Sequence, residues 1–174
     1  MAAQVAHGNG FGDSATTDAP AVYRPALQGP GNLTDLVQRA AELRTAQRME
    51  EALETITQAA KLHPEDPRAA FGLAQISFES WRPAAALFAH ARTLVPGNLD
   101  IIRNHALAMA AEGDGGEAQR LLEDTLKAVP GWADGHRILA VQRITEGDEV
   151  GFDRSYATAV KAEPQNAALW MGWF

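Results

Sequence analysis

The feature of this sequence that most constrains its fold is an apolar pattern that recurs four times. In the copy that begins at Ala118, apolar residues follow at helical spacing, at Leu122 and Leu126, and the copy ends at Pro130. Because proline cannot continue a helix, each copy is expected to be a helix with a fixed end. In every copy the first residue stands twelve positions before the closing proline. The copies span Ala52 to Pro64, Ala84 to Pro96, Ala118 to Pro130 and Phe152 to Pro164.

A second helix is expected before each copy, marked by an alanine that would let two helices approach closely. These alanines are Ala40, Ala74, Ala106 and Ala140. Twelve residues lead from the alanine to the following copy in three units, but only ten in the second unit. We therefore expect two residues to be missing from the inter-helix turn of unit two, with Pro83 in the first turn of the helix that follows.

Helix–turn–helix units of about 34 residues with this pattern resemble the tetratricopeptide repeat. The copies match the second half of the family pattern well, which is a small residue, a large one four positions on, and a closing proline. The first half departs from it, with alanine in place of the family's glycine and Ser77 or Arg143 at its aromatic position. Phe152 is bulky where the family has a small residue. The resemblance covers about Leu33 to Phe174 and implies an all-α fold, a right-handed superhelical array of antiparallel helix pairs.

The chain is predicted to divide into a leader and an array. Residues 1–31 are rich in glycine, alanine, proline and small polar residues without a helical period, which is typical of a disordered segment. The alternative is that this leader docks on the array through Val22, Tyr23 and Leu27. The array is expected over 32–174, with units at 33–66, 67–98, 99–132 and 133–166 and the start of a fifth at 167–174.

Composition excludes several classes of partner and site. A net charge of −7 disfavours a surface that binds nucleic-acid phosphates, so no nucleic acid is expected. The absence of cysteine excludes disulfides and thiolate metal sites. No run approaches the roughly 18 apolar residues that a membrane helix needs, and the N-terminus lacks the pattern of a secretion signal. We therefore expect no membrane partner and a cytoplasmic location.

No catalytic or cofactor motif stands out from the repeat. His105 and His136 lie on the apolar stripes of successive first helices, where two packed histidines are expected instead of a metal site, because no carboxylate shares the stripe. The sequence has no phosphate-binding glycine loop and no nucleophile elbow. The prediction is a chain without catalytic residues, cofactor or metal, and therefore not an enzyme.

The resemblance also implies a concave groove, lined by the first helices, that holds an extended peptide or a partner helix. Three arginines recur about one unit apart on the faces turned away from the packing stripe, and would favour a partner with acidic side chains. Two phenylalanines there would contact an apolar side chain of the partner. The alternative is that these arginines are solvated or paired with Asp100 and Asp134. The predicted partner-binding residues are Arg68, Phe71, Gln75, Phe78, Arg103, Leu107, Arg137 and Val141.

The leading functional prediction is a protein-binding scaffold that takes a peptide or partner helix in this groove. A second reading is an N-terminal accessory or docking domain of a larger enzyme, with the catalytic part beyond residue 174. Residues 151–156 are similar to repeats of chains that continue into an iron/2-oxoglutarate oxygenase or a sulfotransferase domain. A third reading is self-association through Trp170, Trp173 and Phe174, because the last eight residues carry no charge.

Overall fold

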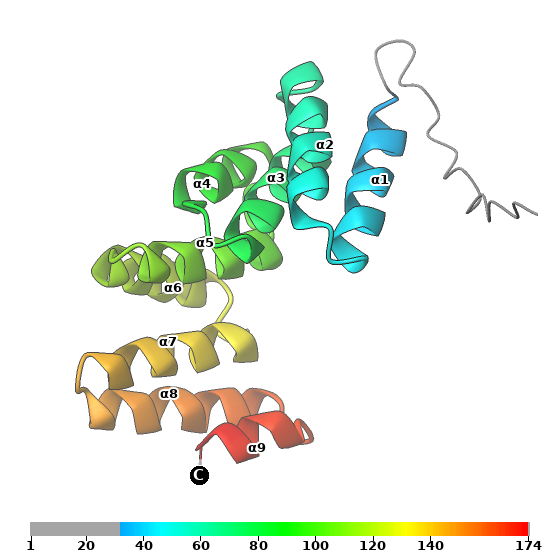
Figure 1. Ribbon diagram of the computed structural model, residues 1–174. Coiled ribbons are helices and arrows are strands. Elements are labelled where there is room, and N and C mark those ends of the chain that lie inside the picture. The colour runs from blue at the N-terminus through cyan, green and yellow to red at the C-terminus, as the bar shows by residue number, and fades with distance from the viewer. Residues whose placement is uncertain (1–31, 174) are drawn as a thin grey trace, which may run out of the picture.

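The computed structural model of the chain describes residues 32–173. Within that range every regular element is an α-helix, and eight of the nine helices form four antiparallel pairs, which α9 follows (Figure 1). The predicted leader and Phe174 lie outside the described residues. The helices are α1 (Leu33–Thr45), α2 (Met49–Leu62), α3 (Pro67–Glu79), α4 (Ala85–Leu94), α5 (Leu99–Ala111), α6 (Gly115–Ala128), α7 (Ala133–Thr145), α8 (Glu149–Ala162) and α9 (Ala167–Trp173).

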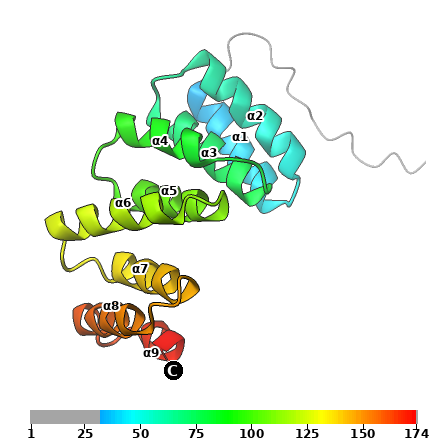
Figure 2. The same cartoon turned by 90° about the vertical axis from the view of Figure 1, so that its left-hand side faces the viewer.

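The pairs stack in chain order, from α1 and α2 at one end to α7 and α8 at the other, with α9 beyond them (Figure 2). Each helix packs against its predecessor and its successor. The first helices also contact one another, α1 with α3, α3 with α5 and α5 with α7, whereas no two second helices of the described chain pack as closely. The first helices therefore form the inner, concave layer of the array and the second helices the outer, convex layer.

The core consists of the residues that the repeat predicts. The four marker alanines of the first helices are at most 1% exposed, and Phe88 and Leu122 of the second helices are fully buried. Burial crosses unit boundaries, because Ile76 of unit two packs in one cluster with Ile56 of unit one. The array thus has no single globular core, and each unit buries its apolar face on its neighbours. The predicted all-α solenoid is confirmed.

First helices begin at a recurring cap. A side-chain oxygen of the residue before the helix accepts a hydrogen bond from a backbone N–H of the first turn, which satisfies a group that the helix leaves unpaired. Unit four departs from this, since Trp132 stands at the cap position and its ring occupies the space that a Cβ on Gly135 would need. The capping residues are Asn32, Asp66, Asn98 and Asn166.

The turn inside each unit ends its first helix with one residue in the left-handed region. Units three and four place Gly113 and Gly147 there, with φ of 97° and 82°, whereas Gln47 and Trp81 have φ of 59° and 58° in units one and two. The N–H of the next residue bonds back to a carbonyl of the last helical turn, as Arg82 does to Ser77 at 3.0 Å. This is a Schellman motif, and it terminates all four first helices in the same way.

The two-residue deletion of unit two shortens a helix, and the turn keeps its left-handed residue. Helix α4 has 10 residues, whereas α2, α6 and α8 have 14 each. Pro83, expected in the first turn of this helix, instead lies ahead of it, because the helix begins at Ala85. That prediction was wrong because the Schellman turn extends through Arg82. Pro83 and Ala84 then connect the turn to the first residue of α4.

Candidate binding surfaces

The first of the three predicted groove arginines, Arg68, is paired with a carboxylate of its own chain. The Arg68 guanidinium donates to the Asp66 carboxylate at 3.1 Å, and this hydrogen bond lowers the pKa of Asp66 below its ordinary value. Gln75 donates to Glu79 at 3.2 Å, and Glu79 also pairs with Arg44 at 3.1 Å. The N-terminal half of the concave face is therefore polar, and its hydrogen-bonding groups are largely engaged within the chain.

A second set of ion pairs runs along α5 and α7. Arg103 lies 3.7 Å from a carboxylate oxygen of Asp100 and 3.7 Å from one of Asp134. Arg137 binds Asp134 more closely, at 2.7 Å. The arginines are thus paired with Asp100 and Asp134, as the alternative reading expects, and their role toward a partner stays a prediction. All four groups are at least one-third exposed, so each pair stabilises the fold by only about 0–1 kcal/mol.

The two predicted aromatic anchors are half-buried. The ring of Phe71 lies 6.0 Å from the ring of Phe88, and the ring of Phe78 lies 6.3 Å from it in an edge-on arrangement. Because Phe88 is the buried centre of unit two, both rings serve its packing. Only their outer edges remain for contact with a partner.

Helix α7 carries an exposed apolar surface farther along the concave layer. Val141 and Ile144, one helical turn apart on α7, are 43% and 40% exposed. Leu107 of α5 is half-buried against the cluster that includes Ile138. The eight predicted residues include Leu107 and Val141 but not Ile144, which follows Val141 at helical spacing and occupies the place of Phe78 in its unit.

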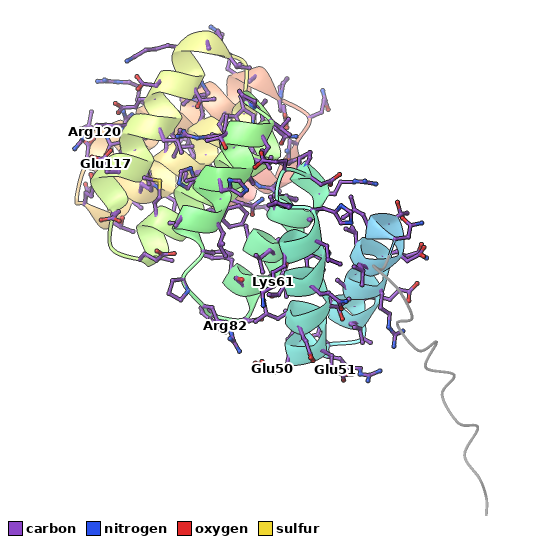
Figure 3. All side chains as sticks on the ribbon, turned by 90° about the horizontal axis from the view of Figure 1, so that it is seen from above. Glu50, Glu51, Lys61, Arg82, Glu117 and Arg120 are labelled. Atoms are coloured by element: carbon purple, nitrogen blue, oxygen red, sulfur yellow. The ribbon has the colours of Figure 1, made fainter. Side chains whose placement is uncertain are left out.

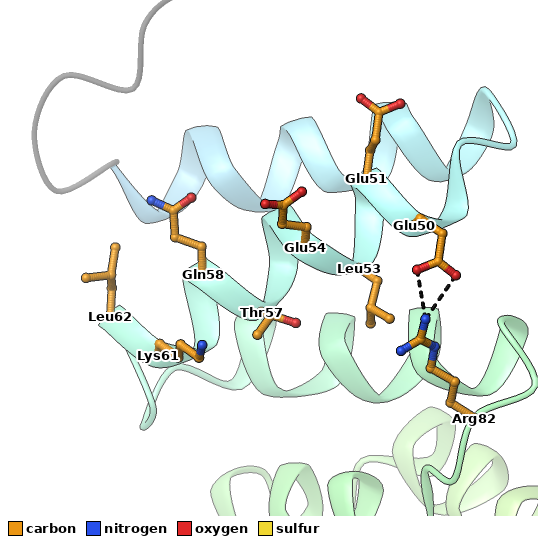
Figure 4. A pocket seen from close by; sticks show the side chains of 9 residues that line it. All are labelled: Glu50, Glu51, Leu53, Glu54, Thr57, Gln58, Lys61, Leu62 and Arg82. Atoms are coloured by element: carbon orange, nitrogen blue, oxygen red, sulfur yellow. Dashed lines mark hydrogen bonds and ion pairs between the residues drawn. The ribbon is translucent and has the colours of Figure 1, made fainter.

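The convex layer carries a groove of about 730 Å³ along α2, which we call the α2 groove. The Arg82 guanidinium closes one end, where it donates to both carboxylate oxygens of Glu50 at 2.9 and 2.7 Å (Figure 4). Viewed from above, Glu117 and Arg120 lie on a different part of the array (Figure 3). The groove is lined by Glu50, Glu51, Leu53, Glu54, Thr57, Gln58, Lys61, Leu62 and Arg82.

Helix α4 takes its N-terminal cap from the next unit. One carboxylate oxygen of Glu112, at the end of α5, accepts from the backbone N–H groups of Ala84 and Ala85 at 2.7 and 2.8 Å. A carboxylate at this end also complements the partial positive charge of the helix terminus. Helix α8 differs, since its own Asp148 caps it by accepting from the N–H of Gly151 at 2.9 Å.

Arg143, at the position where the family has an aromatic residue, joins three helices through polar contacts. Its guanidinium donates to Glu123 of α6 at 2.9 Å and to the Ser155 hydroxyl of α8 at 2.7 Å. Glu123 also accepts from Gln119 at 2.9 Å. The hydrogen bond from Gln119, followed by the contact with Arg143, lowers the pKa of Glu123.

The two stripe histidines have different surroundings. His105 is buried, its Nδ1 has no hydrogen-bond partner within residues 32–173, and burial together with the nearby Arg92 lowers its pKa. His136 is half-exposed, and its Nε2 lies 2.9 Å from the carbonyl oxygen of Pro130. The described residues contain no group of three or more histidine, aspartate or glutamate side chains that could hold a metal ion.

The aromatic side chains of α9 are bonded to the array. The Trp170 indole N–H donates to the Pro164 carbonyl at 3.0 Å, and the Trp173 indole N–H donates to Asp153 at 3.2 Å. Their rings lie 6.1 Å apart. Self-association through these residues and Phe174 stays a prediction.

Comparison with solved structures agrees with this architecture. The crystal structure of MamA superposes with a TM-score of 0.71 at 17% identity, over 80% of this chain and 82% of MamA. MamA from Desulfovibrio magneticus RS-1 gives 0.66 at 17% identity, over 83% and 84%. YrrB, described as a TPR protein with an unusual peptide-binding site, gives 0.53 at 14% identity, over 82% and 98%. The chain has the tetratricopeptide-repeat fold.

At these identities the likeness concerns the fold alone. The sequence itself matches no protein family and no curated protein. Between residues 32 and 173, none of the helices has the length and apolar character of a membrane-spanning segment.

Proposed function

We propose that this chain is a protein-interaction module that binds a segment of a partner protein on its concave face. The observation that carries the proposal is the pair of exposed apolar side chains on α7, Val141 and Ile144, beside the ion pairs of Arg103 and Arg137. The buried cores of interfaces are more apolar than the rest of the protein surface and are enriched in arginine. YrrB, which shares the fold, is described as having a peptide-binding site, and this supports the proposal.

The segment would bury an apolar side chain against Val141, Ile144 and the outer edge of Leu107. A carboxylate on the partner would compete with Asp134 for Arg137 and Arg103. Such an exchange is inexpensive because the existing pairs are half-exposed, and the planar guanidinium can bind a second carboxylate in the same fork geometry. The partner is therefore a segment with an apolar residue next to an acidic one.

Selection of peptides from a displayed random library on the immobilised chain tests this proposal. Selected peptides should carry an apolar–acidic pair, and titration calorimetry should give a saturable isotherm for them. Val141→Asp should weaken this binding by about tenfold or more, since it places a charge in the apolar contact. Glu149→Gln, on the convex α8, is the control and should bind as the wild type does.

If the library yields no binder, or if Val141→Asp binds its peptides unchanged, the concave face is not the binding surface. The docking-domain reading concerns residues beyond 174, so the described part of the chain offers no observation that favours it. A docking domain would also bind protein through its surface, so Val141→Asp and its control Glu149→Gln test that reading in the same way.

A further inference from the structure

Trp81 is a large aromatic residue at a place where the chain elsewhere has glycine or glutamine. Its side chain is 97% exposed, and its φ of 58° places it in the left-handed region where units three and four have glycine. A residue with a Cβ is strained in that region. An indole in solvent gains no packing energy to offset the strain. The turn requires this conformation in every unit, and Gln47 also adopts it, so what the fold leaves unexplained is a bulky, exposed indole at this place.

The turn that carries Trp81 is held in place by both neighbouring units. The Trp81 N–H donates to the Phe78 carbonyl at 3.0 Å, which fixes the turn on the end of α3. The next residue, Arg82, bonds to Glu50 of unit one, and Glu112 of unit three binds the N–H groups that follow. Trp81 is therefore presented on a pre-organised turn, which reduces the entropy lost when it binds a partner.

The α2 groove begins beside this turn. The helical turn missing from α4 would follow directly on Arg82, which lines one end of the groove. The lining recurs at helical spacing from Glu50 to Leu62, which corresponds to a length of about 18 Å along α2. That length suits about three turns of a partner helix packed alongside.

The groove carries three glutamates against two cations, Lys61 and Arg82, and its acidic part around Glu54 favours a basic partner. The side chain of Glu54 makes no hydrogen bond or ion pair within the described residues, and Glu50 is 80% exposed even though it binds Arg82. Leu53 and Leu62 add apolar surface between the charged groups. The net charge of −7 adds attraction for a cationic segment. A lysine or arginine could also lie over the face of the Trp81 indole.

We propose that Trp81 and the α2 groove form a second docking surface, which binds an amphipathic helical segment of another protein that carries basic residues. This surface lies on the convex layer and is independent of the proposed concave site. Leucine side chains of the segment would pack on Leu53 and Leu62, and its cations would reach Glu54 and Trp81.

A defined probe tests this second surface. A short fluorescein-labelled helical peptide built from leucine and lysine at helical spacing is titrated with the chain and followed by anisotropy. We expect saturable binding, which Trp81→Gly and Glu54→Lys each weaken by about tenfold or more, the size of effect typical of a hot-spot residue. The same peptide with glutamate in place of lysine should not bind.

Two control variants test whether the peptide binds at this surface and nowhere else on the chain. Glu149→Gln removes an exposed carboxylate of α8 and should bind like the wild type, and Val141→Asp on the concave face should too. Circular dichroism should show Trp81→Gly fully folded, because glycine occupies the equivalent place in units three and four. Absence of saturable binding, unchanged binding by Trp81→Gly, or an equal loss in Glu149→Gln would each overturn the proposal, the last by revealing general attraction to an acidic surface.

Discussion

Unit two and unit four both turn their second helix back along the first, but they differ in how the turn and the following helix are stabilised. Unit four does so within itself, with Gly147 in the left-handed position and Asp148 as the cap of α8. Unit two has Trp81 in that position, lacks a cap of its own, and takes one from Glu112 of the next unit.

This difference has consequences for stability and for the surface. The deletion in unit two removes a turn of helix and makes α4 depend on its neighbours, and the α2 groove begins beside an exposed tryptophan. In a repeat array, where each unit is stabilised mainly by nearest neighbours, such a unit can be retained because the adjacent units support it. The departure of unit two from the repeat therefore identifies it as a candidate binding surface.

The largest effect is expected from the buried centre of unit two. Phe88→Ala should lower the free energy of unfolding by about 3–5 kcal/mol, since the ring is fully buried and is contacted by Phe71 and Phe78. Urea unfolding followed by circular dichroism measures this. The half-buried Phe78→Ala is the matched control and should cost clearly less; equal losses would mean that burial of Phe88 does not make it the dominant ring of unit two.

The borrowed cap should have the next largest effect. Glu112→Ala removes the acceptor for two backbone N–H groups and should destabilise the chain by about 1–2 kcal/mol. Asp148→Ala, which removes the internal cap of α8, should cost about 1 kcal/mol. Hydrogen exchange should show the Glu112 variant opening at α4, and a loss of protection confined to α5 would contradict capping across the unit boundary.

Exchanging the left-handed residues gives a smaller effect of opposite sign in the two units. Trp81→Gly relieves strain of roughly 1–2 kcal/mol but adds flexibility to the unfolded chain, so we expect no loss or a gain of about 0.5 kcal/mol. Gly147→Ala should destabilise by about 1 kcal/mol, because it introduces that strain. Thermal melts compare the two, and a destabilised Trp81→Gly would mean that the indole does support the fold.

The repeat, the helix pairing and the buried alanines were predictable because they depend on the local spacing of apolar residues and prolines, which can be read from the sequence. Pairing of Arg137 with Asp134 was foreseeable as an alternative, since the two stand one helical turn apart. Trp81 was missed, although a tryptophan aligned with Gly113 and Gly147 was a signal in the sequence. Contacts between units, such as Glu112 with Ala84, depend on how the helices stack, and no spacing within one unit predicts them.

The smallest expected effect is a pH dependence that distinguishes the two joints of unit three. At the joint with unit two, the pKa of buried His105 is lowered from its ordinary value of 6.5 by burial and by Arg92. Below about pH 6.5 the unfolded chain therefore binds a proton that the folded chain does not, and stability falls as the pH falls. At the joint with unit four, the pKa of Glu123 is lowered from 4.5 by Gln119 and Arg143, so its contribution is lost only at lower pH.

His105→Leu and Glu123→Gln separate these two windows. Leucine already stands at the place of His105 in units two and four, at Leu73 and Leu139, so the first variant should fold. Melting temperatures against pH should show a flatter profile just below about pH 6.5 for His105→Leu, and a flatter profile only below about pH 4.5 for Glu123→Gln. If His105→Leu kept the slope of the wild type near pH 6, the histidine would have to be exposed to protonation in the folded chain, and the joint between units two and three would be looser than its packing indicates.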